Sequence, residues 1–208
     1  FLATSSEKIL LIAVSILTVG LSQFVIVPYD ISSYFFLMLF FLFLLKYLNE
    51  NSTGQLIILG TIVLISTLNR ESSALSISLA ATLLLAKFGL RKQTAVSVAV
   101  LGISFLVAYV GMRLMNGNFS TSDGNLLVQN FTQPKNILGL LFGAVFFVFP
   151  FLVAKDRDSI RNIVVCHLLS IPYILMCFYS GILYEIRLYI PLFLTALLLS
   201  RIDVRKFQ

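Results

Sequence analysis

Long apolar runs recur from one end of this chain to the other, and they limit its possible folds more than any other feature. Of the 208 residues, 59% are hydrophobic and only 12% are charged, about half the charged fraction of a typical soluble domain. A helix that crosses a membrane needs about 20 apolar residues, whereas the strands of a membrane barrel give alternating segments of about 10 residues. The runs here are of the first kind, so the sequence predicts an all-α, polytopic bundle of transmembrane helices.

Against a bilayer core of about 30 Å, the runs predict about eight spans within a single transmembrane domain, residues 1–208. We place these spans at residues 9–27, 33–48, 54–68, 71–88, 94–114, 136–154, 162–179 and 182–200. One helix over residues 55–88 would be about 51 Å long, so we expect a hairpin with its tip at residues 69–71. The chain begins at Phe1 without a basic region and cleavage site, and we expect the natural protein to extend upstream.

Basic residues sort the loops onto two sides of the membrane. Three loops, each separated by two spans from the next, carry Lys87, Arg91 and Lys92; Lys155, Arg157 and Arg161; and Arg201, Arg205 and Lys206. The positive-inside rule places these loops and both termini in the cytoplasm. The whole net charge of +6 then falls on the inner side. It favours membrane lipid over nucleic acid as a partner, and it gives no indication of oligomeric state.

Four polar stretches are expected to meet at the outer face. They are VPYDISS (27–33), LNRES (68–72), the loop 115–135 and LYEIR (183–187). In the second stretch, Asn69 would cap the following helix and Glu71 would lie in its first turn, where an anion is favoured. A cation is unfavourable at Arg70, but an arginine beside helix-terminal N–H groups is well suited to bind a phosphate.

Glu185 and Arg187 lie about one turn inside the apolar run 182–200. Ionisable groups within a membrane indicate a functional site by default. Two residues apart on a helix, these side chains cannot pair well with each other, so we expect cross-helix partners, Arg70 for Glu185 and Glu71 for Arg187. Purely structural ion pairs are the alternative interpretation. Asp30 is either a turn residue or a carboxylate in the outer cleft that acts as an acid, a base or a metal ligand.

Three further signals are weak. Asn118 and Asn130 begin N-x-S/T sequons in the long outer loop, which matter only where the source glycosylates. Asp156 and Asp158 form a D-x-D pair among basic residues, which is typical of a solvated loop. The single histidine of the chain cannot form a catalytic triad or a zinc site by itself.

Three short motifs give the chain a family resemblance: NRES at a helix start, PYD before a phenylalanine-rich span, and YEIRLYIP late in the sequence. With the overall architecture, they resemble the GT-C class of membrane glycosyltransferases, which transfer a sugar from a polyprenyl-phosphate donor at the outer membrane face. The resemblance implies catalytic carboxylates at Asp30, Glu71 and Glu185. It implies phosphate or headgroup roles for Arg70 and Arg187, and a bacterial inner (plasma) membrane as the location. We also expect Asn69 and Arg113 to bind substrate. An acidic residue in the first outer loop of that class acts as a base or binds metal, so the cofactor stays open between none and a divalent ion.

The sequence departs from that class in two ways, because Asp30 stands alone where many members carry paired acids, and because the class usually has more spans. Two other functions therefore stay open. One is a transporter, flippase or polysaccharide polymerase that binds an anionic lipid-linked substrate, and the other is a non-catalytic assembly subunit. Transport favours polar residues near mid-membrane and repeated halves, which we do not find. We expect sugar transfer for envelope glycan assembly, with membrane lipid and a lipid-linked sugar as partners.

Overall fold

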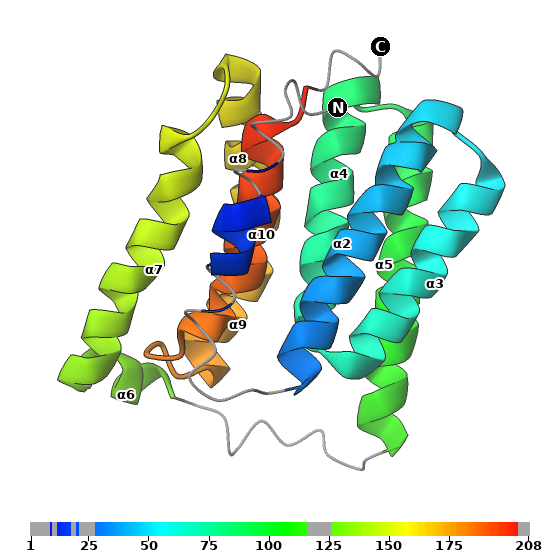
Figure 1. Ribbon diagram of the computed structural model, residues 1–208. Coiled ribbons are helices and arrows are strands. Elements are labelled where there is room, and N and C mark those ends of the chain that lie inside the picture. Colours follow the sequence, from blue (N-terminus) through cyan, green and yellow to red (C-terminus); the bar gives the residue numbers. More distant parts are fainter. Residues whose placement is uncertain (1–8, 10–11, 18–19, 21–27, 116–125, 204–208) are drawn as a thin grey trace. The chain divides into compact units, whose positions relative to one another are not determined.

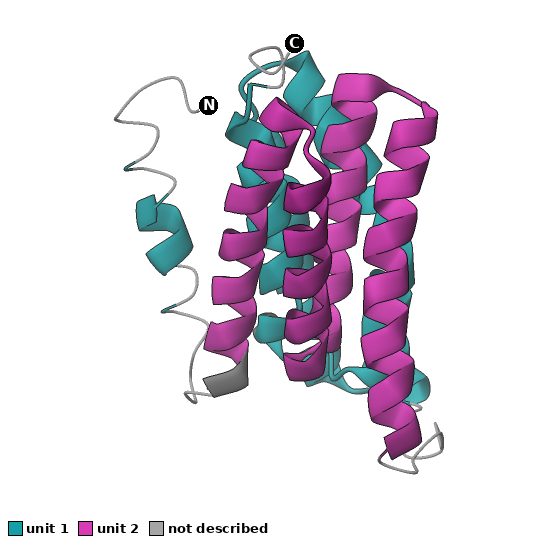
Figure 2. Cartoon of the chain, turned by 90° about the vertical axis from the view of Figure 1, so that its right-hand side faces the viewer, with its two compact units in different colours: residues 1–26, 120–203 teal, residues 27–119, 204–208 magenta. Residues whose placement is uncertain are grey.

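The computed structural model describes residues 28–115 and 126–203, together with residue 9, residues 12–17 and residue 20. In these ranges the regular elements are all helices, as predicted (Figure 1). The chain divides into two compact units (Figure 2): unit 1 is residues 1–26 and 120–203, and unit 2 is residues 27–119 and 204–208. That residues 1–208 form a single transmembrane domain stays a prediction.

Unit 2 is a bundle of antiparallel helices joined by short turns. Its elements are α2 (Pro28–Glu50), α3 (Thr53–Asn69), the 3₁₀ helix η1 (Glu71–Ser73), α4 (Ala74–Phe88) and α5 (Lys92–Met115). Asn51 has a φ of 50° in the α2–α3 turn and Gly89 a φ of 68° after α4. Both residue types tolerate this left-handed backbone, which ends a helix sharply. Helix α3 packs against α2 and α5, and α4 packs against α5.

Unit 1 is built around one buried helix. Its elements are α6 (Leu127–Thr132), α7 (Pro134–Leu152), α8 (Arg157–Leu169), α9 (Ile171–Ser180), the 3₁₀ helix η2 (Ile186–Leu188) and α10 (Ile190–Arg201). Every residue of α10 up to Ser200 is buried, and α7 and α8 pack against it. The axes of α8 and α9 differ by 50°. Pro172, the second residue of α9, has no backbone N–H, which explains why the α8 hydrogen-bond ladder breaks there.

Four of the described helical segments are long and apolar enough to cross a membrane, and the bent pair α8–α9 makes a fifth if it is one span. The four are Asp30–Glu50, Glu71–Phe88, Lys92–Met115 and Pro134–Leu152. Helices α3 and α10 are apolar but shorter, and most of the expected span 9–27 lies outside the described residues. The predicted count of eight spans is therefore not confirmed.

The predicted helix at residues 182–200 is wrong over its first part. Helix α10 begins only at Ile190, with Pro191 in its first turn, and residues 181–189 form an irregular strap that contains η2. Tyr173 Oη donates to the Leu188 carbonyl (2.9 Å) and Tyr189 Oη to the Leu183 carbonyl (3.1 Å). Side chains thus satisfy backbone groups that a continuous helix would have paired internally.

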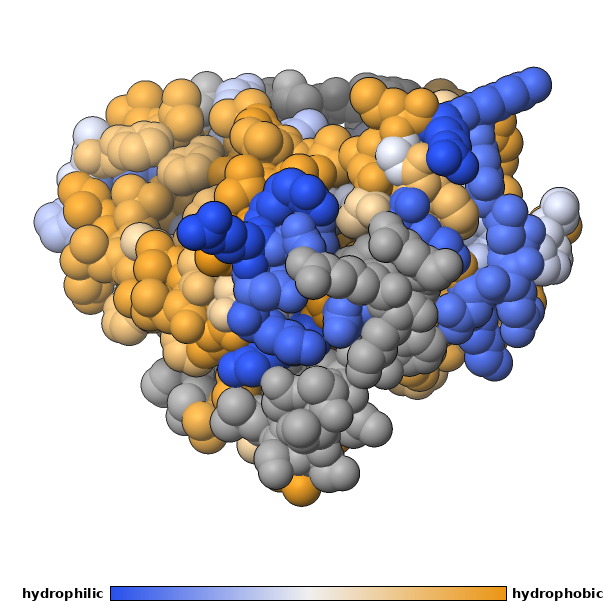
Figure 3. All heavy atoms as spheres, turned by 90° about the horizontal axis from the view of Figure 1, so that it is seen from above, coloured by the Kyte–Doolittle hydropathy of each residue, from blue (hydrophilic) through white to orange (hydrophobic). Residues whose placement is uncertain are grey.

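The surfaces of the helices suit a lipid environment. Large apolar side chains are exposed along the flanks of both units, among them Ile57, Ile103, Leu141, Val145 and Leu175. Viewed end-on, hydrophilic side chains gather at helix ends and apolar side chains cover the flanks (Figure 3). Exposed apolar area on this scale is costly in water but is favourable against hydrocarbon. The fold therefore agrees with an integral membrane protein.

In unit 1, two of the predicted basic loops lie side by side. The backbone N–H of Lys155, after α7, donates to the Ser200 carbonyl in α10 (3.0 Å), and Lys155 Nζ lies 3.6 Å from an Asp203 carboxylate oxygen. These two loops therefore share one end of unit 1, as the charge pattern predicts.

Candidate functional site

The candidate site lies where the chain reverses between α3 and α4. Helix α3 ends at Asn69, Arg70 is extended (φ −162°, ψ 144°), and Glu71 begins η1. The reversal agrees with the predicted hairpin (Figure 1). The expectation that Asn69 caps the next helix is wrong, because Asn69 is the last residue of α3. Glu71 does lie in the first turn of η1, where the positive end of the helix dipole favours a negative charge.

The Asn69 side chain fixes the reversal to the start of α2. Its Oδ1 accepts a hydrogen bond from Ser32 Oγ (2.9 Å), and its Nδ2 donates to Ser33 Oγ (3.0 Å). A single amide thereby joins two successive serines of another helix. Sequence reasoning missed these serines, although the stretch DISS, directly after a proline helix start, was a usable signal.

Asp30 and Arg70 form a buried ion pair between α2 and the tip of the hairpin. Asp30 is in the first turn of α2 and is fully buried, while the Arg70 side chain is 18% exposed. The interpretation of Asp30 as a turn residue is therefore wrong, because Pro28 starts a helix that includes it. A buried carboxylate is retained only where a cation and hydrogen bonds compensate for its lost hydration.

Glu71 and Arg113 form a second pair, which is open to the surroundings. Arg113 Nη2 lies 2.8 Å from Glu71 Oε1, and the two side chains are 35% and 39% exposed. Arg113 is in the last turn of α5, where the helix dipole favours a cation. Its guanidinium also lies over the Tyr109 ring, 5.2 Å from the ring centroid. This pairing was not predicted, because Arg113 stands at the end of a span with no motif around it.

Together, Asp30, Asn69, Arg70, Glu71 and Arg113 make up what we call the tip cluster. It contains two arginines and two carboxylates at one end of unit 2, and the chemistry that such a set supports is the binding of an anion and the transfer of a proton.

Glu185 and Arg187 belong to unit 1 and pair with each other. Arg187 Nη2 lies 2.7 Å and Nε 2.9 Å from Glu185 Oε2. The expectation that these two residues cannot pair is wrong, since it assumed a regular helix, and the strap around η2 turns both side chains toward each other. The predicted pairs of Arg70 with Glu185 and of Glu71 with Arg187 would join residues of the two units, and they stay predictions. Arg70 pairs with Asp30 and Glu71 with Arg113.

One of the two sequons is buried. Asn130, in α6, has no exposed area and uses its whole amide. Its Nδ2 donates to the carbonyls of Phe178 (2.9 Å) and Gly181 (2.7 Å), and its Oδ1 accepts from the Leu183 N–H (3.2 Å). Asn130 is thus a structural residue that holds the strap, while Asn118 lies outside the described residues.

Within the described parts of the chain, His, Cys, Asp and Glu side chains form no group of three or more that could hold a metal ion. Comparison with known proteins found no protein-family model, no curated protein and no solved structure that matches this chain.

Proposed function

We propose that this chain acts at the outer face of a bacterial inner membrane and transfers a sugar from a polyprenyl-phosphate donor during envelope glycan assembly. One observation carries the proposal: two arginine–carboxylate pairs gather at one end of an apolar helical unit, where a lipid-borne phosphate can reach them. The positive-inside pattern assigns that end to the outer side.

Arg70 and Arg113 bind the donor phosphate in this proposal. Both side chains are partly exposed, and an arginine fork binds phosphate oxygens with two parallel hydrogen bonds. The exposed pair of Arg113 with Glu71 contributes only about 0–1 kcal/mol. A phosphate therefore displaces Glu71 from Arg113 at little cost.

Glu71, once released from Arg113, serves as the general base. It takes the proton of the acceptor hydroxyl as that oxygen attacks the anomeric carbon of the sugar. The bond from the anomeric carbon to the phosphate oxygen breaks, and the electron pair leaves with the phosphate. The two arginines stabilise the charge that develops there.

Asp30 has a positioning role. Because it is fully buried, it holds Arg70 at the tip of the hairpin and does not meet the acceptor. The bonds from Asn69 to Ser32 and Ser33 fix the same contact. The roles of Glu185 as a second carboxylate and of Arg187 as a phosphate ligand stay predictions.

The test is the binding of polyprenyl phosphate and of the matching polyprenol to purified protein, titrated by native mass spectrometry. We expect the phosphate to bind at least about tenfold more tightly than the alcohol. Arg113→Gln should reduce that preference about tenfold, since a hydrogen bond to a charged group contributes about 1.5–3 kcal/mol. Glu71→Gln should keep the binding and abolish sugar release from a polyprenyl-phosphate sugar.

Arg91→Gln is the matched control, because Arg91 is an exposed arginine in the α4–α5 turn of the same unit. The proposal is wrong if the alcohol binds as tightly as the phosphate, or if Arg91→Gln and Arg113→Gln have the same effect.

A non-catalytic assembly subunit is the second candidate function. The observation in its favour is that both arginines of the tip cluster, and Arg187 in unit 1, each pair with a carboxylate of their own unit. In that case the pairs only stabilise the fold, and Arg113→Gln changes stability without changing the selectivity for phosphate.

A further inference from the structure

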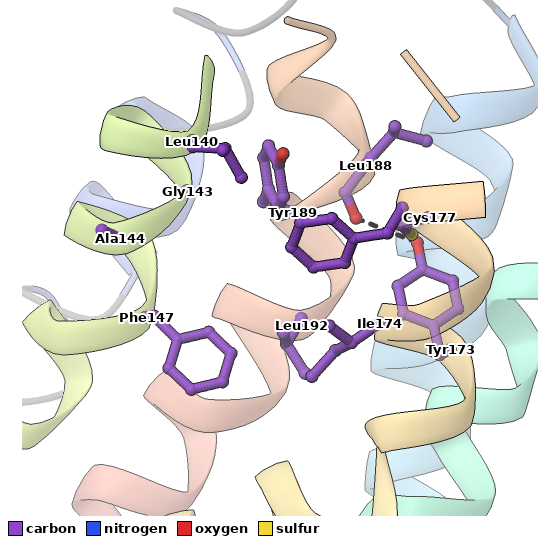
Figure 4. Close-up of a pocket in the computed structure, with 11 residues that line it drawn as sticks. Leu140, Gly143, Ala144, Phe147, Tyr173, Ile174, Cys177, Leu188, Tyr189 and Leu192 are labelled. Atoms are coloured by element: carbon purple, nitrogen blue, oxygen red, sulfur yellow. Dashed lines mark hydrogen bonds between the residues drawn. The ribbon is translucent and has the colours of Figure 1, made fainter. Parts of the chain in front are cut away.

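Unit 1 contains a cavity of about 310 Å³ between α7, α9 and the start of α10 (Figure 4). This volume is at the lower end of the range for ligand pockets, about 300–1,000 Å³. Side chains from all three helices point into it, including Leu140, Phe147, Ile174, Cys177, Phe178 and Leu192. The cavity is partly open to the surroundings of unit 1, so a molecule from the phase around the unit can enter it.

The two tyrosines in the lining of the cavity offer an occupant no hydrogen-bond donor. Tyr173 Oη is bound to the Leu188 carbonyl, a bond drawn in Figure 4, and Tyr189 Oη is bound to the Leu183 carbonyl. Neither tyrosine hydroxyl therefore has a proton left to donate to an occupant, and the rest of the lining is apolar. Water and sugars need two or more polar partners in a buried site, and this lining excludes them.

The strap forms one wall of the cavity, and contacts with α7 and α6 hold it in place. A Cβ added to Gly139 in α7 would lie 2.2 Å from the Leu183 carbonyl oxygen, so α7 and the strap are in backbone contact. A Cβ at Gly143 would lie 3.2 Å from the Tyr189 ring. The three hydrogen bonds of Asn130 hold the start of the strap at Gly181 and Leu183 and the end of α9 at Phe178. The cavity is thus a fixed feature and not a loosely closed loop.

We propose that this cavity binds one hydrocarbon chain of a membrane lipid, with the anionic headgroup of that lipid at Arg187. Hydrocarbon is the phase that surrounds unit 1 in a membrane, and it is the chemistry that the lining accepts. Arg187 directly precedes Leu188, which lines the cavity, and its side chain is 28% exposed. The shared chemistry is an apolar chain with an anionic head, which a phospholipid or a polyprenyl phosphate can supply.

This inference does not depend on the proposed sugar transfer. The cavity and Arg187 belong to unit 1, whereas Glu71 and Arg113 belong to unit 2. Saturable binding of a lipid chain in unit 1 can hold when transfer at the tip cluster fails, and the reverse is also true.

The test uses the absence of tryptophan from the chain. Phe178→Trp places a single fluorophore at the cavity, and Leu175→Trp places one on the exposed flank of the same helix, at a side chain that is 61% exposed. Phosphatidylglycerol with brominated acyl chains, which quenches tryptophan on contact, is titrated into protein in detergent. We expect quenching of Trp at position 178 to saturate near one lipid per protein. Quenching at position 175 should rise only in proportion to the lipid content of the micelle.

A cavity-filling variant checks the location. Ala144→Phe in the Phe178→Trp background should abolish the saturable quenching, whereas Val145→Phe, on the exposed side of α7, should leave it unchanged. Arg187→Gln should raise the half-quenching concentration about tenfold, which is the effect of losing one charge-assisted hydrogen bond. Unlabelled phosphatidylglycerol and polyprenyl phosphate are then compared as competitors, and the one that reverses quenching at the lower concentration supplies the chain.

The inference is overturned if Trp at position 178 is quenched in the same linear way as Trp at position 175. An unchanged half-quenching concentration in Arg187→Gln would show that the lipid headgroup does not bind at Arg187. The unmodified chain gives an independent reading by native mass spectrometry. One lipid should remain bound per wild-type protein in detergent, and finding none would also overturn the inference.

Discussion

Asp30 and Glu71 are carboxylates of one cluster that differ in their access to solvent. Asp30 is fully buried against Arg70, whereas Glu71 and its partner Arg113 are more than one third exposed. Burial makes the first pair sensitive to the loss of one partner, because the remaining charge has no hydration to return to. The exposure of the second pair, in contrast, allows a ligand to replace Glu71 at Arg113.

This difference predicts that neutral substitutions of the two carboxylates will have very different effects on stability. Asp30→Asn should destabilise the protein by about 3–5 kcal/mol, the usual effect of leaving one buried charge without its partner. Glu71→Gln should change stability by less than about 1 kcal/mol. Unfolding by denaturant in detergent measures both. Adding Arg70→Gln to Asp30→Asn should recover part of the loss, and a double variant as unstable as the sum of the singles would contradict a direct pair.

Asn130 carries a second prediction at the scale of a single residue. Asn130→Ala removes three hydrogen bonds within unit 1 and leaves their backbone partners buried, so we expect a loss of about 2–4 kcal/mol. Thermal unfolding in detergent provides the measurement. Thr132→Ala is the control, since it also destroys the sequon but removes only one exposed bond, to the Val128 carbonyl. Equal losses in the two variants would show that Asn130 does not hold the strap.

Residue identity in the sequence indicated the candidate side chains but not their partners. Asn69, Arg70 and Glu71 were visible as a polar interruption in an apolar run. Asp30 was visible as the one acid just before the phenylalanine-rich run 33–48. Pairing depends on where helices begin. Helix α2 begins at Pro28, so Asp30 lies within the helix and pairs with Arg70. The predicted span began only at residue 33 and left Asp30 outside it.

At the scale of elements, three of the four long helical segments of unit 2 could be located to within about two residues, and the fourth, α2, begins five residues before the predicted span. Predicted spans at 54–68, 71–88 and 94–114 correspond to Thr53–Asn69, Glu71–Phe88 and Lys92–Met115. Apolar runs bounded by charged or glycine-containing turns made these boundaries clear. The strap before α10 could not be located, because LYEIRLYI is apolar enough to be helical, and only tertiary contacts of the strap decide otherwise.

Glycine positions test the contact between α7 and the strap. Gly139→Ala should destabilise unit 1 strongly, since the added Cβ would lie 2.2 Å from a backbone oxygen that cannot move independently. Gly102→Ala, in the middle of α5, meets nothing within 4 Å and should be neutral or stabilising by up to about 1 kcal/mol. Midpoints of thermal unfolding compare the two. A tolerated Gly139→Ala would mean that α7 and the strap are not in contact.

At the scale of the whole molecule, the sequence predicted the class of fold and more spans than the described helices provide. Composition alone separates a membrane bundle from a soluble domain, since 59% of the residues are hydrophobic. The number of crossings is harder to derive, because α3 has only 17 residues and α10 is shorter than the run 182–200 that predicted it. Buried apolar helices and lipid-crossing helices have the same composition, and only packing distinguishes them.

The side of the membrane on which each turn lies can be tested at the scale of the whole molecule. In a variant with Cys166 and Cys177 replaced by serine, Leu90→Cys in the α4–α5 turn should react with a membrane-impermeant maleimide only after cells are permeabilised. Tyr184→Cys in the strap should react in intact cells. Both positions are exposed, at 95% and 53% respectively, so access to the reagent is set by the membrane. The reverse pattern would place the tip cluster on the cytoplasmic side and exclude an outer-face reaction.

The proposed function depends most on whether the tip cluster binds phosphate or only holds helices together, and a charge exchange distinguishes the two. In the double variant Glu71→Arg with Arg113→Glu, the ion pair can re-form with its signs reversed, so stability should return to near the wild-type value. The decisive measurement is the affinity of this variant for polyprenyl phosphate. We predict that it stays at least about tenfold weaker than wild type, because the arginine no longer stands where the phosphate arrives. Wild-type affinity in the exchanged variant would contradict the proposal and leave the pair with a structural role.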